Sequence, residues 1–180
     1  MGVISSAELH RVRSGHEWAL IALDDHTGLV AIQSSYGAFN HIWPPQHRSQ
    51  PLGEFIATLD FDYFMTKTRG TAAREFDFDG TVANIRGWIK RARRERGISK
   101  DVARDAISAL DAIDHTTSSD YFATQICDDA DLMQALGSEW YEAFRTRYTP
   151  ECEWFWKTIW ADFRWQLLCR DGLESPFIGL

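Results

Sequence analysis

The sequence is poor in cysteine and contains no long hydrophobic run. Its three cysteines, Cys127, Cys152 and Cys169, are widely spaced and form no Cys-x-x-Cys pair, which argues against a zinc site or a dithiol redox centre. We expect all three to be reduced thiols in the core. The segment Met1–Gly15 lacks the apolar stretch of a secretory signal, and no apolar run approaches the roughly 18 residues that span a membrane. The sequence therefore predicts a cytoplasmic protein with no membrane partner.

The chain also has fewer basic than acidic residues. It carries 19 Lys and Arg against 26 Asp and Glu, a formal net charge of -7, which disfavours general attraction to nucleic acid or to anionic membranes. The charge is unevenly distributed, however. Residues 86–104 contain eight basic and two acidic residues, whereas residues 105–153 contain eleven acidic residues and only two Lys or Arg. The sequence therefore predicts two oppositely charged regions.

Strand-forming residues on the N-terminal side predict a small antiparallel sheet. The runs 16–23 and 29–35 are rich in β-formers and are separated by a turn in which Gly28 suits a positive φ. The run 36–43 alternates imperfectly and reads as a further strand after a kink at Gly37. We expect about three strands.

Apolar residues at steps of three and four predict that the rest of the chain is mainly helical. Cap signals place Asp79, Ser99 and Ser119 at the starts of three of these helices. The predicted helices cover residues 51–68, 81–96, 101–113, 120–126 and 132–136. The fold class is thus α+β, a small N-terminal antiparallel sheet packed on a mainly helical body. The length of 180 residues fits a single domain, residues 1–180.

A tryptophan-rich helix is predicted at residues 150–169. Thr149 and Pro150 suit its cap and first position. Apolar residues nearly encircle its axis, with Trp156 and Trp160 on one side and Trp154 and Trp165 on another. We therefore expect burial on more than one side of this helix.

A short motif invites a catalytic interpretation. Residues 76–84 contain Asp-x-Asp-Gly-Thr, which is similar to the signature of haloacid-dehalogenase-type phosphatases, with Asp77 as nucleophile and Asp79 as acid/base. That chemistry needs the first Asp at the end of a buried parallel strand, and the preceding residues 71–76 contain no aliphatic run. We interpret Asp79 as a helix cap and Asp77 as solvated. The sequence thus predicts no catalytic residue and no enzyme.

The histidines do not indicate a metal site. Among six histidines, His41 and His47 are a close pair across the Pro-rich loop, and no third ligand is placed beside them. Hydrogen-bonded or exposed histidines are the more common explanation of such scatter. We expect no metal ion and no cofactor.

The two charged regions are the candidate binding surfaces. In the basic helix, Arg86, Lys90, Arg93 and Arg94 could neutralise phosphates, although a solvated helix face is the more common role and no helix-turn-helix partner is evident. In the acidic region, carboxylates one helical turn apart lie roughly 5–6 Å from one another and could imitate the phosphates of DNA. A role in keeping the protein surface soluble would explain the same acidic residues equally well. The acidic candidates are Asp111, Asp114, Asp128, Asp129, Asp131 and Glu139.

Four segments carry a resemblance to known proteins: IQSSYGAFNHIW, PLGEFIATLDFDYFMTKT, the segment Phe78–Ile89 and FWKTIWADF. Across about 32–165 the chain resembles small uncharacterised accessory proteins of tailed phages and prophages of proteobacteria. The resemblance implies an origin and no catalytic residue. By analogy, small acidic phage proteins without a catalytic signature include inhibitors of host defence, anti-CRISPR proteins among them.

The sequence therefore supports two hypotheses of function. In the first, the protein inhibits a host defence complex, for example a CRISPR effector, in the cytoplasm of the host bacterial cell, by binding it through an acidic DNA-mimicking face. In the alternative, it is a phage regulatory or nucleic-acid-processing accessory that binds nucleic acid through the basic helix 85–96. The expected partner is a host protein or nucleoprotein complex. A homodimer is left open.

Overall fold

The structure, a computed structural model, describes residues 7–95 and 97–170. These residues form two compact units, each with its own hydrophobic core. The first unit combines residues before Arg74 with those from Tyr148 onward, and the second comprises Arg74–Arg147. The second unit is thus inserted into the first along the chain. The single domain predicted for residues 1–180 from the chain length stays a prediction.

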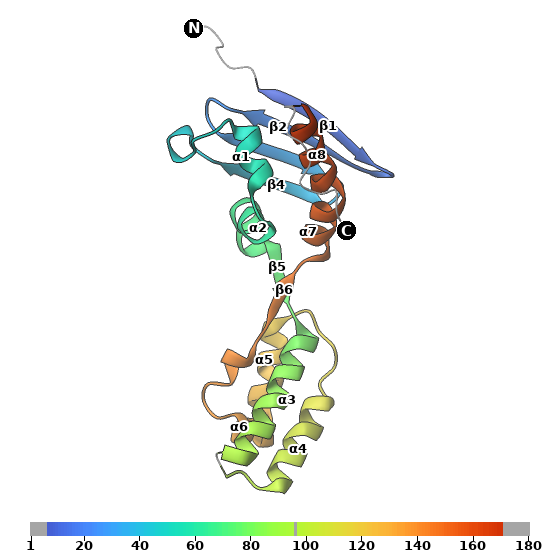
Figure 1. The fold of residues 1–180 in the computed structure, drawn as a ribbon. Helices are drawn as coiled ribbons and strands as arrows, with labels where there is room; N and C mark the ends of the chain where they lie inside the picture. The colour runs from blue at the N-terminus through green and yellow to red at the C-terminus, as the bar shows by residue number, and fades with distance from the viewer. Residues whose placement is uncertain (1–6, 96, 171–180) are drawn as a thin grey trace. The chain divides into compact units, whose positions relative to one another are not determined.

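The first unit is built on a four-stranded antiparallel sheet whose strands pair in chain order (Figure 1). Its strands are β1 (Glu8–Ser14), β2 (Glu17–Asp24), β3 (Leu29–Ser34) and β4 (Gly37–Ile42). The α+β class is confirmed, with four strands in place of about three. The missed strand is β1, which follows β2 through a full register from Glu8 opposite Leu23 to Ser14 opposite Glu17. Gly28 has the predicted positive φ, +78°.

One face of this sheet is buried beneath helices (Figure 1). The helices of this unit are α1 (Leu52–Thr58), α2 (Phe61–Arg69), α7 (Pro150–Phe155) and α8 (Ala161–Arg170), with a π-helical segment at Trp156–Trp160 between the last two. Phe39 stacks on Phe155 with 4.0 Å between ring centroids, and Phe64 lies 4.3 Å from Trp160. Trp160 is fully buried, so its truncation should cost about 3–5 kcal/mol.

Two predictions about these helices are wrong. The single helix expected over residues 51–68 is two helices, because the chain is extended at Leu59 and Asp60 caps α2 by accepting a hydrogen bond from the Tyr63 amide. The tryptophan-rich helix starts at the predicted cap, Thr149. Its second apolar side is not buried, however, since Trp154 and Trp165 are 57% and 52% exposed.

The second unit is helical apart from two short strands that form their own sheet (Figure 1). Its elements are β5 (Arg74–Phe76), α3 (Phe78–Glu95), α4 (Lys100–Asp111), α5 (Ser119–Asp128), α6 (Ala130–Leu136) and the start of β6 (Thr146–Tyr148). A 3-10 turn spans Trp140–Ala143, and another, in the first unit, spans Pro45–His47; a third 3-10 turn covers Gly70–Ala73. The apolar residues of α3, α4, α5 and α6 form one core.

Buried polar contacts fix the start of α3 against the end of this unit. Thr81 is fully buried and its hydroxyl accepts a hydrogen bond from the Arg145 amide at 2.9 Å. Asn84 donates to the Ala143 carbonyl at 2.8 Å. Because buried polar groups are costly when unpaired, these contacts specify where the segment after α6 lies on α3.

Some local predictions in the second unit are corrected. The helix after the Asp-x-Asp motif begins at Phe78, and Asp77 caps it by accepting a hydrogen bond from the Gly80 amide at 2.9 Å, whereas Asp79 lies within the first turn. Ser118 rather than Ser119 caps α5. Ser99 caps α4 as predicted. Cys127 is exposed and is not a core thiol, Cys152 is buried, and the side chain of Cys169 lies outside the described residues, as does Arg96.

Candidate nucleic-acid interface

A groove of about 520 Å³ lies between α3 and α4, the two helices that run side by side in the second unit (Figure 1). Five of its eight lining residues are basic. The basic residues are Lys90, Arg93 and Arg94 from α3 and Lys100 and Arg104 from α4, and the others are Ala103, Ile107 and Ser108. The walls are thus cationic, and the apolar members come from α4.

Helical spacing explains why these side chains meet. Residues three and four apart share one face of a helix, which places Lys90, Arg93 and Arg94 together while Ile89 and Ala92 face the core. The connection to α4 includes residues 97–99, where Gly97 has a φ of +74°. The Ser99 side chain accepts a hydrogen bond from the Val102 amide at 3.1 Å and starts α4. The connection between the helices thus brings the two cations of α4, Lys100 and Arg104, beside the three cations of α3.

Most of the groove's positive charge is not balanced by neighbouring carboxylates. Arg104 lies 2.9 Å from both Asp101 and Asp105, and its hydrogen bond to Asp105, with the charges of both carboxylates, raises the pKa of Arg104. Among the described residues, the other four cations, Lys90, Arg93, Arg94 and Lys100, form no ion pair. The groove therefore offers four uncompensated cations to an anionic ligand.

The structure brings together three of the four basic residues singled out from the sequence. Arg86 does not line the groove; it forms an ion pair with Asp111 at the end of α4. Lys100 and Arg104 are not among the candidates predicted from the sequence, although both belong to the basic region. The signal that could have found them is the helix stop at Gly97 followed by the cap at Ser99, because a short connection makes successive helices antiparallel neighbours.

The acidic candidates are spread over helix ends and connections. Asp111 is paired with Arg86, and Asp129 caps α6 by accepting a hydrogen bond from the Leu132 amide at 2.9 Å. The remaining four are exposed and have no ion pair with another described residue: Asp114, Asp128, Asp131 and Glu139. They do not follow one another along a single helix, so the expected spacing of one helical turn does not describe them.

The Asp-x-Asp motif lies in a setting unlike that of the phosphatases it resembles. Asp77 follows a strand of three residues in a two-stranded sheet. Its carboxylate is occupied by the Gly80 amide, and a Cβ at Gly80 would lie 2.1 Å from that carboxylate. Asp79 is exposed. The close approach of Asp77 to Gly80 is thus explained by the start of α3. Asp77 caps this helix, in place of the predicted cap Asp79.

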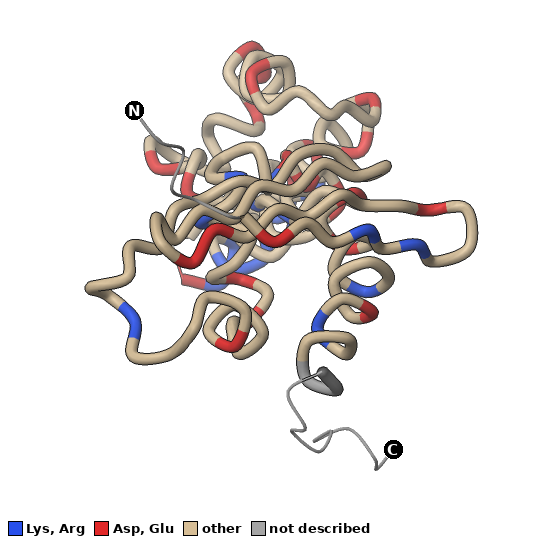
Figure 2. Tube along the Cα trace, turned by 90° about the horizontal axis from the view of Figure 1, so that it is seen from above, with Lys and Arg blue, Asp and Glu red and all other residues tan. Residues whose placement is uncertain are grey.

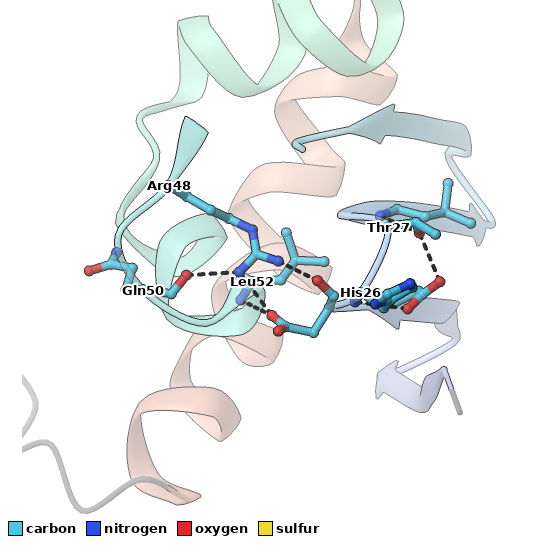
Figure 3. A network of polar contacts seen from close by, with 8 residues as sticks. His26, Thr27, Arg48, Gln50 and Leu52 are labelled. Atoms are coloured by element: carbon cyan, nitrogen blue, oxygen red, sulfur yellow. Dashed lines mark hydrogen bonds and ion pairs between the residues drawn. The ribbon is translucent and has the colours of Figure 1, made fainter. Parts of the chain in front are cut away.

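A polar network in the first unit is structural in character (Figure 3). Asp25, in the β2–β3 turn, accepts hydrogen bonds from the Leu52 amide at 2.6 Å and from the Arg48 guanidinium at 2.9 Å. The Leu52 hydrogen bond, assisted by Arg48, lowers the pKa of Asp25. Arg48 also donates to the Gln50 carbonyl, so the network anchors the Pro-rich loop and the start of α1.

The histidine pair of the Pro-rich region shows no metal-site geometry within the part of the chain that is described. No group of three or more His, Cys, Asp or Glu residues able to hold an ion occurs there. The ring of His41 packs edge-on against Trp43 at 4.6 Å. Partial burial, with a smaller contribution from Lys67, lowers the pKa of His41.

Comparison with known proteins places the chain in a family. No helix within the described segments is long and apolar enough to cross a bilayer. No curated protein and no solved structure matches the chain significantly. A family model described as a phage family matches residues 1–170. Because this match covers nearly the whole chain, the protein belongs to that phage family.

Proposed function

We propose that this phage protein is a non-enzymatic accessory factor that binds nucleic acid through the α3–α4 groove, in the cytoplasm of the host bacterial cell. The observation that supports this most directly is the gathering of five basic side chains from two helices around one groove, four of them without an ion pair among the described residues. Cationic walls of this kind attract the phosphate backbone and release its counterions on binding.

The composition of the groove favours phosphate contacts over the reading of bases. Its polar lining consists of Lys, Arg and one serine, Ser108, whose hydroxyl already donates to the Arg104 carbonyl at 3.1 Å. Contacts to phosphates position a protein on nucleic acid but carry no sequence information. We therefore expect binding that depends strongly on salt and weakly on sequence.

The test is a direct binding measurement on the full chain. Fluorescence anisotropy with a labelled DNA duplex is measured for the wild type and for the quadruple alanine variant at Lys90, Arg93, Arg94 and Lys100. We expect the quadruple variant to bind more than tenfold more weakly at low salt, since each lost phosphate contact removes counterion release. Arg86→Ala is the matched control, because Arg86 belongs to the same helix but lies outside the groove. Equal affinities of the wild type and the quadruple variant would contradict the proposal.

A second candidate is inhibition of a host defence complex, for example a CRISPR effector. The favouring observation is that Asp114, Asp128, Asp131 and Glu139 are exposed and have no ion pair within the described residues. Such carboxylates could occupy a basic surface built for nucleic acid. Here the protein would bind a host protein or nucleoprotein complex, with the acids as its contacts.

Charge reversal separates the second candidate from the first. Lysine at those four acidic positions should abolish capture of the host complex in a pull-down from phage-host lysate, whereas Glu151→Lys, an exposed acid of the first unit, should leave capture unchanged. Binding to DNA should rise in the same variant if the groove acts alone. Retained capture by a folded reversal variant would dismiss the acidic candidate.

A further inference from the structure

The outer face of the four-stranded sheet carries apolar and basic side chains. Side chains alternate between the two faces of a strand, and those opposite the core remain accessible: Leu9 is 58%, Trp18 43%, Leu20 37% and Ile42 53% exposed. Arg11 and Arg13 project from the same face of β1 and are exposed. The outer face is defined by Arg11, Arg13, Trp18, Leu20, Gln33 and Ile42.

Strand register brings the aromatic and basic members together. Arg13 lies directly opposite Trp18, and Arg11 directly opposite Leu20. Gln33 of β3 lies opposite Leu20 on its other side, so Arg11, Leu20 and Gln33 form one row across three strands. Directly opposed side chains have Cβ atoms about 4.5–5.5 Å apart, and two residues along a strand are separated by about 7 Å. Trp18 and Leu20 thus lie opposite two arginines of β1 on one face of the sheet.

The position of Trp18 is fixed by its backbone. Its amide donates to the Ser35 hydroxyl at 3.3 Å, and its carbonyl accepts from the Ser35 amide at 3.1 Å. The Ser35 hydroxyl in turn donates to the Glu17 carboxylate. These hydrogen bonds hold the backbone of Trp18, so a ligand that stacks on its ring does not have to order this strand end.

The charge of this face identifies the kind of ligand. Neither Arg11 nor Arg13 forms an ion pair with another described residue. The acid on the same side of β2, Asp24, accepts hydrogen bonds from the Thr27 hydroxyl and the His26 amide. Figure 2 shows the Lys and Arg positions in blue and the Asp and Glu positions in red along the Cα trace. In a protein of net charge -7, an exposed indole beside two arginines that have no ion pair within the described segments is complementary to a ligand with exposed rings and phosphates.

We propose that the outer face of the sheet binds single-stranded nucleic acid. A base stacks on Trp18 and contacts Leu20, while Arg11 and Arg13 contact phosphates and Gln33 lies within the same row to donate to or accept from a base. An exposed indole on a sheet face suits unstacked bases, which a duplex does not offer. This inference shares only its ligand class with the proposed function, since it rests on residues of the first unit.

The test uses the full chain and a labelled oligothymidylate of about 12 nucleotides, within the site sizes of single-strand-binding domains. Trp18→Ala should weaken binding about tenfold, as expected for loss of one stacking contact, and Trp18→Phe should restore most of the affinity. Trp154→Ala is the matched control, because Trp154 is even more exposed, at 57%, and lies on α7. Replacing Arg11 and Arg13 with Gln should lower the slope of log K against log salt by about 1.4 on single strands.

The outcomes separate this inference from the groove. Trp18→Ala should leave duplex binding unchanged, whereas the quadruple groove variant should weaken it. If the groove variant binds normally and Trp18→Ala still weakens single-strand binding, the groove proposal fails and the sheet-face inference stands. Equal affinities of Trp18→Ala and Trp154→Ala for oligothymidylate would overturn the inference. So would a wild-type dimer, seen by sedimentation, that dissociates in Trp18→Ala while oligothymidylate binding is unchanged, because the face would then join two copies of this chain.

Discussion

The salt dependence of DNA binding gives the sharpest prediction for the groove. The perturbation is the replacement of Lys90, Arg93, Arg94 and Lys100 with Gln, which removes charge while keeping polar side chains of similar length. None of the four has an ion pair among the described residues, so each charge is available for one phosphate.

The expected magnitude follows from counterion release. On duplex DNA each neutralised phosphate contributes about 0.9 to the slope of log K against log salt, so the four substitutions should flatten that slope by about 3.6 if all four contact phosphates. Arg104 should contribute less, because Asp101 and Asp105 already balance its charge. The Asp101→Asn and Asp105→Asn double variant should therefore bind more tightly and show a steeper slope than the wild type.

The assay is fluorescence anisotropy of a labelled duplex, titrated with protein at several salt concentrations between about 50 and 200 mM. Circular dichroism of each variant provides the folding control, and Arg86→Gln should keep the wild-type slope. A slope that does not change in the quadruple variant would refute the reasoning. So would a weaker affinity after Asp101 and Asp105 are neutralised.

Three further predictions concern stability. Trp160→Ala should lower the free energy of unfolding by about 3–5 kcal/mol in urea titrations because Trp160 is fully buried, whereas Trp154→Ala, at an exposed site, should change it by less than about 0.5 kcal/mol. Thr81→Val should cost about 1–3 kcal/mol by leaving the Arg145 amide unpaired, and Thr81→Ser, measured in the same titration, should recover most of the loss. The pKa of Asp25 is lowered in the folded state, so its contribution is present above the unfolded-state value, near 3.8, and is lost as pH falls through the folded-state pKa. Urea titrations of the wild type and Asp25→Asn should therefore differ at neutral pH and converge in acid; a constant difference would contradict this assignment.

Local signals in the sequence predicted two helix starts correctly but not how the surfaces are exposed. Ser99 and Thr149 cap the helices they were expected to cap, since a cap depends on neighbouring residues only. Burial around the tryptophan-rich helix depends on how many elements cover it, which periodicity does not encode. Trp154 consequently lies in solvent, although its spacing resembles that of the buried residues.

The strand β1 shows why a half-exposed edge strand is hard to recognise. Only Val12 is buried in this strand, so the alternation of apolar and polar residues is weak. The two outward arginines make the segment resemble a polar loop. Its pairing with β2 is nevertheless complete. For the groove, the basic side chains of α3 could be grouped by helical spacing, but the contribution of α4 required the turn at Gly97 that brings the two helices together.

The net charge of the second unit conceals the feature on which its proposed function depends. Residues 74–147 contain eleven basic and fourteen acidic residues, yet eight of the eleven fall between residues 86 and 104. At physiological salt, charges more than about 8–10 Å apart are largely screened from one another. A phosphate in the groove would therefore respond to the cations that line it rather than to distant carboxylates. An acidic unit of this kind can therefore bind nucleic acid in one groove although its own net charge disfavours general attraction to nucleic acid.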